Sequence, residues 1–207
     1  MSGMFRRAGV TTALLLGALP ALRQVRAQDT LPVGFGSLQR ADVVISFSTG
    51  PLQIQILPLD ESVTRLLAPD TYSSLAQLIK QQRAQIDDQA QRAGVQTPTL
   101  VLVTFFGTVS QARFVPEDIN LTSRGRLYRP VGIVPLSPQW GGQQLDARQQ
   151  ATAIYLFDTG IAFGESLTAS YEGMNNDSWT KTLQKLNSER ARVLSRAAAR
   201  APASPSH

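Results

Sequence analysis

Short segments of alternating apolar and polar residues constrain the fold of this chain most. Residues 43–48 alternate in this way, and residues 52–56 repeat the pattern after Gly50 and Pro51. Side chains two positions apart on a β-strand share a face, so this period predicts strands with one buried and one solvated face. The Gly-Pro turn between them predicts an antiparallel pair.

Further strand candidates follow at intervals set by turn residues. Residues 100–106 and 151–157 are apolar at consecutive positions, which predicts central strands covered on each side. Shorter candidates are residues 112–115, 119–122, 127–134 and 167–171. Pro130 and Pro135 make the third of these an edge strand or two broken pieces, and residues 137–150 are expected to form a loop.

Two segments change to a helical period. Apolar residues recur at three-, four- and seven-residue intervals over residues 71–93, and again over residues 178–199. Asp70 or Thr71 is the expected N-cap of the first helix, and Asp177 or Ser178 that of the second. The stripes consist of Tyr72, Leu75, Ile79, Ile86 and Ala90 in the first helix and Trp179, Leu183, Leu186, Val193 and Ala197 in the second.

These patterns together predict a mainly β protein. We expect an antiparallel, immunoglobulin-like β-sandwich with one inserted amphipathic helix and a C-terminal helix, in a single domain over residues 41–200. Residues 28–40 contain Pro32, Gly34 and Gly36 without periodicity and are expected to form a flexible entry segment. Residues 201–207 are small and polar, so we expect a disordered tail.

Residues 1–27 have the organisation of a cleavable secretory signal peptide. Arg6 and Arg7 precede an apolar stretch over residues 10–22, and small residues at positions 25 and 27 precede Gln28. The alternative is an N-terminal membrane anchor, but the apolar stretch is shorter than the roughly 20 residues that span a bilayer. We predict cleavage after Ala27 and a periplasmic or secreted bacterial protein, without a transmembrane segment in its mature form.

The chain contains no cysteine. This composition excludes disulfides, thiolate catalysis, cysteine-ligated zinc and the acylated cysteine of a bacterial lipoprotein. A secreted domain without disulfides must be held together by its hydrophobic core, for which roughly 180 residues suffice.

The net charge of +5 depends on the leader. Residues 1–27 hold four of the 20 basic residues and none of the 15 acidic ones, so the chain without them has a net charge of +1. This charge gives no argument for a nucleic-acid partner. The remaining charge is uneven, because the segment from Thr180 onward is basic and the preceding part is mildly acidic.

The residue types on which most catalysis depends are missing or poorly placed. The only histidine is His207, the last residue, which excludes histidine bases and histidine-ligated metals. Acids adjacent in sequence point in different directions and are poor candidates for a shared substrate. The adjacent pairs are Asp60-Glu61, Asp87-Asp88 and Glu117-Asp118. We therefore predict no catalytic residue, no metal ligand and no cofactor.

Two features are candidates for binding. Trp140 lies in a glycine-flanked loop, where an indole either anchors a ligand or packs over the end of the sandwich. The second helix carries four arginines: Arg190, Arg192, Arg196 and Arg200. They would touch anionic lipid or polysaccharide, bind an acidic protein surface, or form a solvated face that suits the helix dipole. The strand aromatics Phe105, Phe106, Tyr155, Phe157 and Tyr171 are expected to be core.

Three segments carry a resemblance. They are "RGRLYRPVGIVPL" at residues 124–136, "AIYLFD" at residues 153–158 and "LTASYEG" at residues 167–173. In this order they resemble bacterial secreted immunoglobulin-like modules, the telokin-like immunoprotection domains and their relatives. The resemblance implies an exported β-sandwich and no common active site.

The expected function follows from export and from the missing catalytic residue types. We expect a non-enzymatic β-sandwich protein that binds a protein or a cell-envelope component. One alternative is a carboxylate-dependent glycan hydrolase, built from acids that are distant in sequence. Another is a calcium-stabilised adhesion module.

Overall fold

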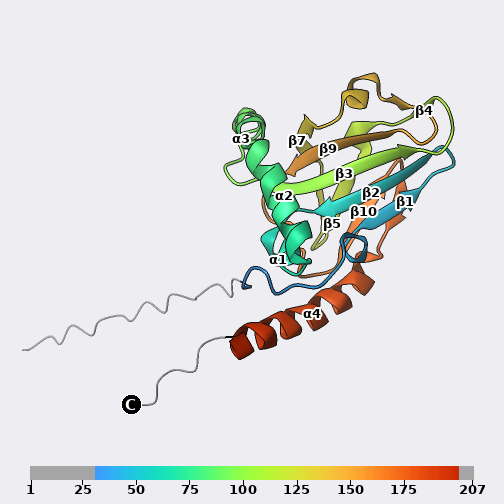
Figure 1. The fold of residues 1–207 in the computed structure, drawn as a ribbon. Coiled ribbons are helices and arrows are strands. Elements are labelled where there is room, and N and C mark those ends of the chain that lie inside the picture. The colour runs from blue at the N-terminus through green and yellow to red at the C-terminus, as the bar shows by residue number, and fades with distance from the viewer. Residues whose placement is uncertain (1–30, 201–207) are drawn as a thin grey trace, which may run out of the picture.

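Antiparallel β-strands dominate the structure, a computed structural model that describes residues 31–200. Eleven strands form three sheets, and a long helix ends the described chain (Figure 1). The prediction of a mainly β protein with a C-terminal helix is therefore confirmed. The signal peptide predicted over residues 1–27 and the tail predicted over residues 201–207, which includes His207, lie outside the described residues.

The larger sheet has five strands in the order β1-β2-β3-β9-β7, all antiparallel to their neighbours. Its strands are β1 (Ile45–Ser48), β2 (Leu52–Pro58), β3 (Thr99–Gly107), β9 (Gln150–Phe157) and β7 (Pro130–Pro135). The hairpin predicted around Gly50 and Pro51 is confirmed, with Phe47 opposite Ile54. The strands predicted to be central, β3 and β9, each pair on both sides, and β7 forms an edge.

The second sheet has four strands in the order β11-β10-β5-β6. Its strands are β5 (Asn120–Ser123), β6 (Arg126–Tyr128), β10 (Leu167–Tyr171) and β11 (Met174–Asn176), and the short strands β4 (Ala112–Arg113) and β8 (Gln144–Leu145) form a separate pair. The candidate strand 127–134 is split, because β6 belongs to this sheet and β7 to the larger one. Arg124 and Gly125, both with positive φ, form the two-residue turn between β5 and β6.

The inner faces of the two sheets meet in an aromatic core. The rings of Phe105 on β3 and Tyr171 on β10 lie 5.8 Å apart between centroids. The hydroxyl of Tyr155 donates to the carbonyl of Pro116 at 2.9 Å, and that of Tyr171 accepts from the amide of Val115 at 3.1 Å. Burial raises the pKa of Tyr171 to about 12. This packing of one sheet on the other is consistent with a β-sandwich.

The segment of the chain that connects β2 to β3 contains three helices: α1 (Glu61–Thr64), α2 (Pro69–Gln81) and α3 (Arg83–Arg92). The prediction of a single helix over residues 71–93 is wrong, because the helix is interrupted at Gln82. The break turns α3 onto β7 and β9, where Ile86 and Ala90 are buried. The expected N-cap is also wrong. The α2 helix begins at Pro69, whose fixed φ suits a first helical position, and Ala68 is its N-cap.

The second predicted helix is continuous as α4 (Trp179–Arg200) and lies beside the described start of the chain (Figure 1). Part of the segment expected to be flexible makes defined contacts. The amide of Leu38 donates to the carbonyl of Leu66 at 3.1 Å, and the carbonyl of Leu38 accepts from the amide of Ala68 at 2.9 Å. This segment leads into the 3₁₀ turn η1 (Arg40–Asp42) and then into β1.

Candidate functional site

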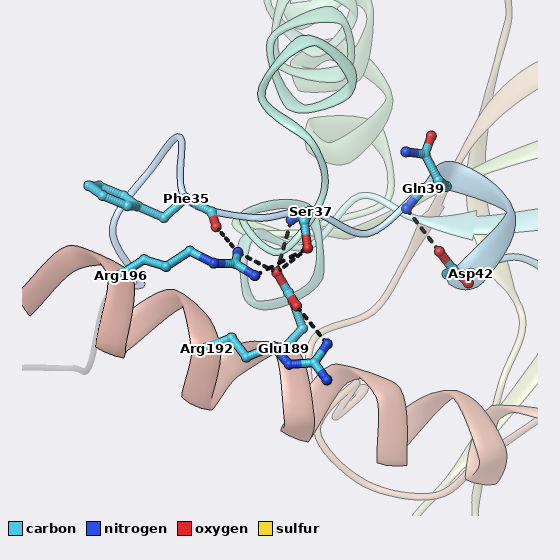
Figure 2. A network of polar contacts seen from close by, with 7 residues as sticks. All are labelled: Phe35, Ser37, Gln39, Asp42, Glu189, Arg192 and Arg196. Atoms are coloured by element: carbon cyan, nitrogen blue, oxygen red, sulfur yellow. Dashed lines mark hydrogen bonds and ion pairs between the residues drawn. The ribbon is translucent and has the colours of Figure 1, made fainter. Parts of the chain in front are cut away.

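The four arginines of α4 have different partners. Arg196 donates through Nη1 to the Glu189 carboxylate at 2.9 Å and to the carbonyl of Phe35 at 2.5 Å (Figure 2). Arg192 lies 3.7 Å from the same carboxylate. Arg190 donates to the side chain of Asn187, and the guanidinium of Arg200 lies 5.6 Å from the centre of the Phe35 ring. The structure therefore brings Arg192 and Arg196 together at Glu189 and leaves Arg190 apart from them.

Glu189 is the centre of this network, although it is only 1% exposed. Its Oε1 accepts from the amide of Ser37 at 2.9 Å and from the Ser37 hydroxyl at 2.8 Å. Burial raises the pKa of the Glu189 carboxyl, but the hydrogen bonds from Ser37 and Arg196 outweigh it and hold the pKa below its ordinary value. The sequence contains a signal for this burial, since Glu189 is three residues from Leu186 and four from Val193 on the apolar stripe.

Trp140 lies in a 3₁₀ turn, η3 (Pro138–Gly142), and is 8% exposed. The centre of its ring system lies 5.3 Å from that of Phe114, 5.8 Å from that of Phe105 and 5.9 Å from that of Tyr155. The sequence left two alternatives for this indole, a ligand anchor or packing over the end of the sandwich. The second describes its position.

The outer face of the five-stranded sheet changes character along the strands. The row formed by Leu57, Leu102 and Ile154 is buried. The helices α2 and α3 lie at the end of the sheet where β3 begins (Figure 1). The next two rows are polar at most positions and lie progressively farther from the helices. They are Gln55, Thr104 and Thr152, followed by Gln53, Phe106 and Gln150, each set in cross-strand register.

Apart from Gln53, the residues of these two rows line a groove of about 400 Å³, which we call the sheet groove. It is lined by Arg40, Gln55, Leu78, Leu102, Thr104, Phe106, Leu136, Gln150 and Thr152. The expectation that Phe106 belongs to the core is wrong, since this side chain is partly exposed in the groove. The other four strand aromatics are buried as predicted. The pattern Gln-x-Gln on β2 was the sequence signal for an open face beside Phe106.

Hydroxyl groups form part of the groove lining. Thr152 donates through Oγ1 to the Oγ1 of Thr104 at 3.3 Å, and its amide donates to the hydroxyl of Ser137 at 2.9 Å. Thr104 is buried, whereas Gln55 and Thr152 are partly exposed. The Gln55 amide can donate and accept hydrogen bonds, and the Thr152 hydroxyl, whose proton is donated to Thr104, can accept them.

Arg40 supplies the charge of the sheet groove. Within residues 31–200, no acid lies within ion-pair distance of its guanidinium. Burial lowers the pKa of Arg40 below its ordinary value, although arginine stays protonated at neutral pH. The groove therefore combines one available cation with neutral hydrogen-bonding groups and an aromatic ring.

The acid pairs found in the sequence take part in local interactions. Asp60 caps α1 by accepting from the amide of Ser62 at 2.8 Å. Asp87 and Asp88 form ion pairs with Arg83 and Arg92 on α3. Glu117 and Asp118 lie in the 3₁₀ turn η2 (Pro116–Asp118). Among the described residues, no group of three or more histidines, cysteines or acids is placed to hold a metal ion.

None of the helices over residues 31–200 has the length and apolar character needed to cross a membrane. Comparisons of the chain with protein-family models, with curated proteins and with solved structures find no match. The function is therefore argued from the geometry of this chain, and the resemblance to telokin-like immunoprotection domains stays a prediction.

Proposed function

We propose that this chain is an exported, non-enzymatic protein that binds a cell-envelope component in the sheet groove. The observation that supports this proposal most is the open half of the outer sheet face. There, Gln55, Thr104 and Thr152 lie in register next to the partly exposed Phe106. Elsewhere in the described chain, most large apolar side chains are used for packing.

The chemistry of the lining favours binding over catalysis. A glycosidase of the usual type needs two carboxyl groups about 5–10 Å apart on either side of the substrate. The sheet groove is lined by no acid, and its only charged side chain is Arg40. Amides, hydroxyls and an aromatic ring fix the orientation of a ligand without reacting with it. The proposed role is therefore recognition.

The location in the cell envelope rests on the leader. The basic, apolar and small-residue regions over residues 1–27 are typical of an export signal, and cleavage after Ala27 would release residues 28–207. The immunoglobulin-like arrangement of the sandwich belongs to the same proposal and is supported by the two packed antiparallel sheets.

Co-sedimentation of residues 28–207 with isolated envelope fractions tests the proposed function. Two double variants separate the candidate surfaces: Gln55→Ala with Gln150→Ala in the groove, and Arg190→Gln with Arg200→Gln on α4. We expect the groove variant to remain in the supernatant and the α4 variant to sediment like the unmodified protein. Loss of sedimentation in the α4 variant alone, or no sedimentation of any form, would overturn the proposal.

A further inference from the structure

We infer that the sheet groove binds an acidic oligosaccharide, with a sugar ring against Phe106 and a sugar carboxylate paired with Arg40. This inference names the ligand class of the proposed function and rests on it. The ligand-sized volume of the groove, about 400 Å³, lies within the range of roughly 300–1,000 Å³ that is usual for small-molecule sites.

The position of Phe106 favours a sugar over a purely polar ligand. Phe106 lies opposite Gln150 of β9 in cross-strand register, and both side chains line the groove. A pyranose ring has an apolar C–H face and hydroxyl groups around its edge. The aromatic ring suits the apolar face, and the neighbouring Gln150 amide is placed to bond the hydroxyls.

The second row of the groove extends the polar contacts. Gln55 and Thr152 are partly exposed beside the buried Thr104. The Gln55 amide donates and accepts, whereas the Thr152 hydroxyl donates its proton to Thr104 and offers a ligand its acceptor lone pairs. A sugar hydroxyl can donate to either side chain and can accept from the Gln55 amide. Neutral side chains of this kind match a chain of hydroxyl-bearing rings better than a hydrophobic peptide.

Arg40 selects for negative charge. A guanidinium binds a carboxylate through two parallel hydrogen bonds, and within residues 31–200 no acid lies within ion-pair distance of the exposed Arg40 side chain. Phosphate recognition commonly uses several arginines together, whereas Arg40 is the only cation in the lining. One cation beside a neutral, aromatic surface fits a sugar acid with one carboxylate per ring.

Calorimetric titration of residues 28–207 tests the inference with matched probes. The acidic probes are the hexamers of galacturonate and mannuronate, and the neutral probes are their full methyl esters. We expect the acids to bind at least about tenfold more tightly than the esters. Arg40→Gln should abolish this preference, and Phe106→Leu should weaken both probes by a similar factor.

Two variants outside the groove serve as controls. Arg113→Gln removes a charge on β4, and Leu127→Ala removes an exposed apolar side chain on β6; both should bind like the unmodified protein. The inference is overturned if acids and esters bind equally, if neither binds, or if Arg113→Gln has the effect of Arg40→Gln. Saturable binding of inorganic phosphate in preference to the sugar acids would also overturn it.

Different results would contradict the ligand class and the proposed function. If envelope fractions sediment with the protein through the groove but no uronate binds, the ligand class is wrong and the proposed function stands. If Gln55→Ala with Gln150→Ala leaves envelope sedimentation unchanged, the proposed function itself is wrong.

Discussion

The Oε1 atom of Glu189 accepts hydrogen bonds from both the amide and the hydroxyl of Ser37, although 152 residues separate them in the sequence. These bonds fasten the start of the described chain to α4 (Figure 2). A second contact follows shortly after, where Lys185 pairs with Asp42 at 2.9 Å. Arg40 lies between Ser37 and Asp42 in the sequence, so α4 holds the segment that carries the cation of the sheet groove.

Glu189→Gln should destabilise the protein. The amide keeps the size of the side chain, but it loses the charge that Ser37 and Arg196 solvate inside the protein. Hydrogen bonds to a charged group typically contribute about 1.5–3 kcal/mol, so we expect the free energy of unfolding to fall by about 1–3 kcal/mol. Chemical denaturation measures this loss.

Glu172→Gln is the matched control, because Glu172 is exposed. Its unfolding free energy should stay within about 0.5 kcal/mol of the unmodified value. Equal stability of Glu189→Gln and Glu172→Gln would mean that the buried network contributes nothing measurable.

The free energy of unfolding should fall in acid, partly because the Glu189 carboxylate becomes protonated. Its folded-state pKa is below the ordinary value, so ionisation stabilises the fold fully above the ordinary glutamate pKa. That contribution is lost as the pH falls through the lowered folded-state pKa. Asp42, whose pKa is lowered chiefly by the hydrogen bond from Lys185, acts in the same direction.

Unfolding curves between about pH 7 and pH 2 measure this dependence. We expect Glu189→Gln to follow a shallower decline than the unmodified protein. Parallel pH profiles for the two proteins would show that the Glu189 carboxylate does not titrate with a lowered pKa.

The main effect of Trp140→Ala should be a loss of stability. The indole packs against Phe105, Phe114 and Tyr155, and removing a buried aromatic side chain typically costs about 3–5 kcal/mol. Thermal unfolding measures the cost, and Trp140→Phe should be the milder change. An unaltered melting temperature together with lost ligand binding would instead identify Trp140 as a recognition anchor.

Gly36→Ala should destabilise the contact between the entry segment and the loop after α1. A Cβ at Gly36 would lie closer than van der Waals contact to the backbone carbonyl groups of Leu66 and Leu67. Overpacking of this kind typically costs about 1–3 kcal/mol. Gly50→Ala is the matched control, because open space surrounds the position of its Cβ. Equal unfolding midpoints for the two variants would contradict the tight approach.

The periodicity of apolar residues predicted the strands and helices whose contacts are local or regularly spaced. The alternation over residues 52–56 marked β2, and the stripe from Trp179 to Val193 marked α4. The break at Gln82 escaped prediction, because the apolar spacing from Ile79 to Ile86 continues across it. What decides the break is the surface of β7 and β9 on which α3 lies, and the sequence does not encode that surface locally.

The candidate site was less predictable than the fold. Trp140 and the four arginines stood out by residue type, whereas Phe106 was hidden in an apolar run and Arg40 in a segment without periodicity. Glu189 lies on the apolar stripe of α4, which is a signal for its burial, but its partner Ser37 is remote in sequence. Cross-strand register and hydrogen bonds between residues remote in sequence produce these arrangements. Neither can be read from the local sequence pattern.

Amide chemical-shift mapping would locate the ligand on the surface of the protein. Isotope-labelled residues 28–207 would be titrated with soluble glycan released from envelope fractions, and the shifted amides would be assigned. We predict shifts concentrated at Arg40, Gln55, Thr104, Phe106 and Thr152, with α4 beyond Glu189 unaffected. Shifts concentrated on α4 at Arg190 and Arg200, with the amides of the groove unchanged, would contradict it.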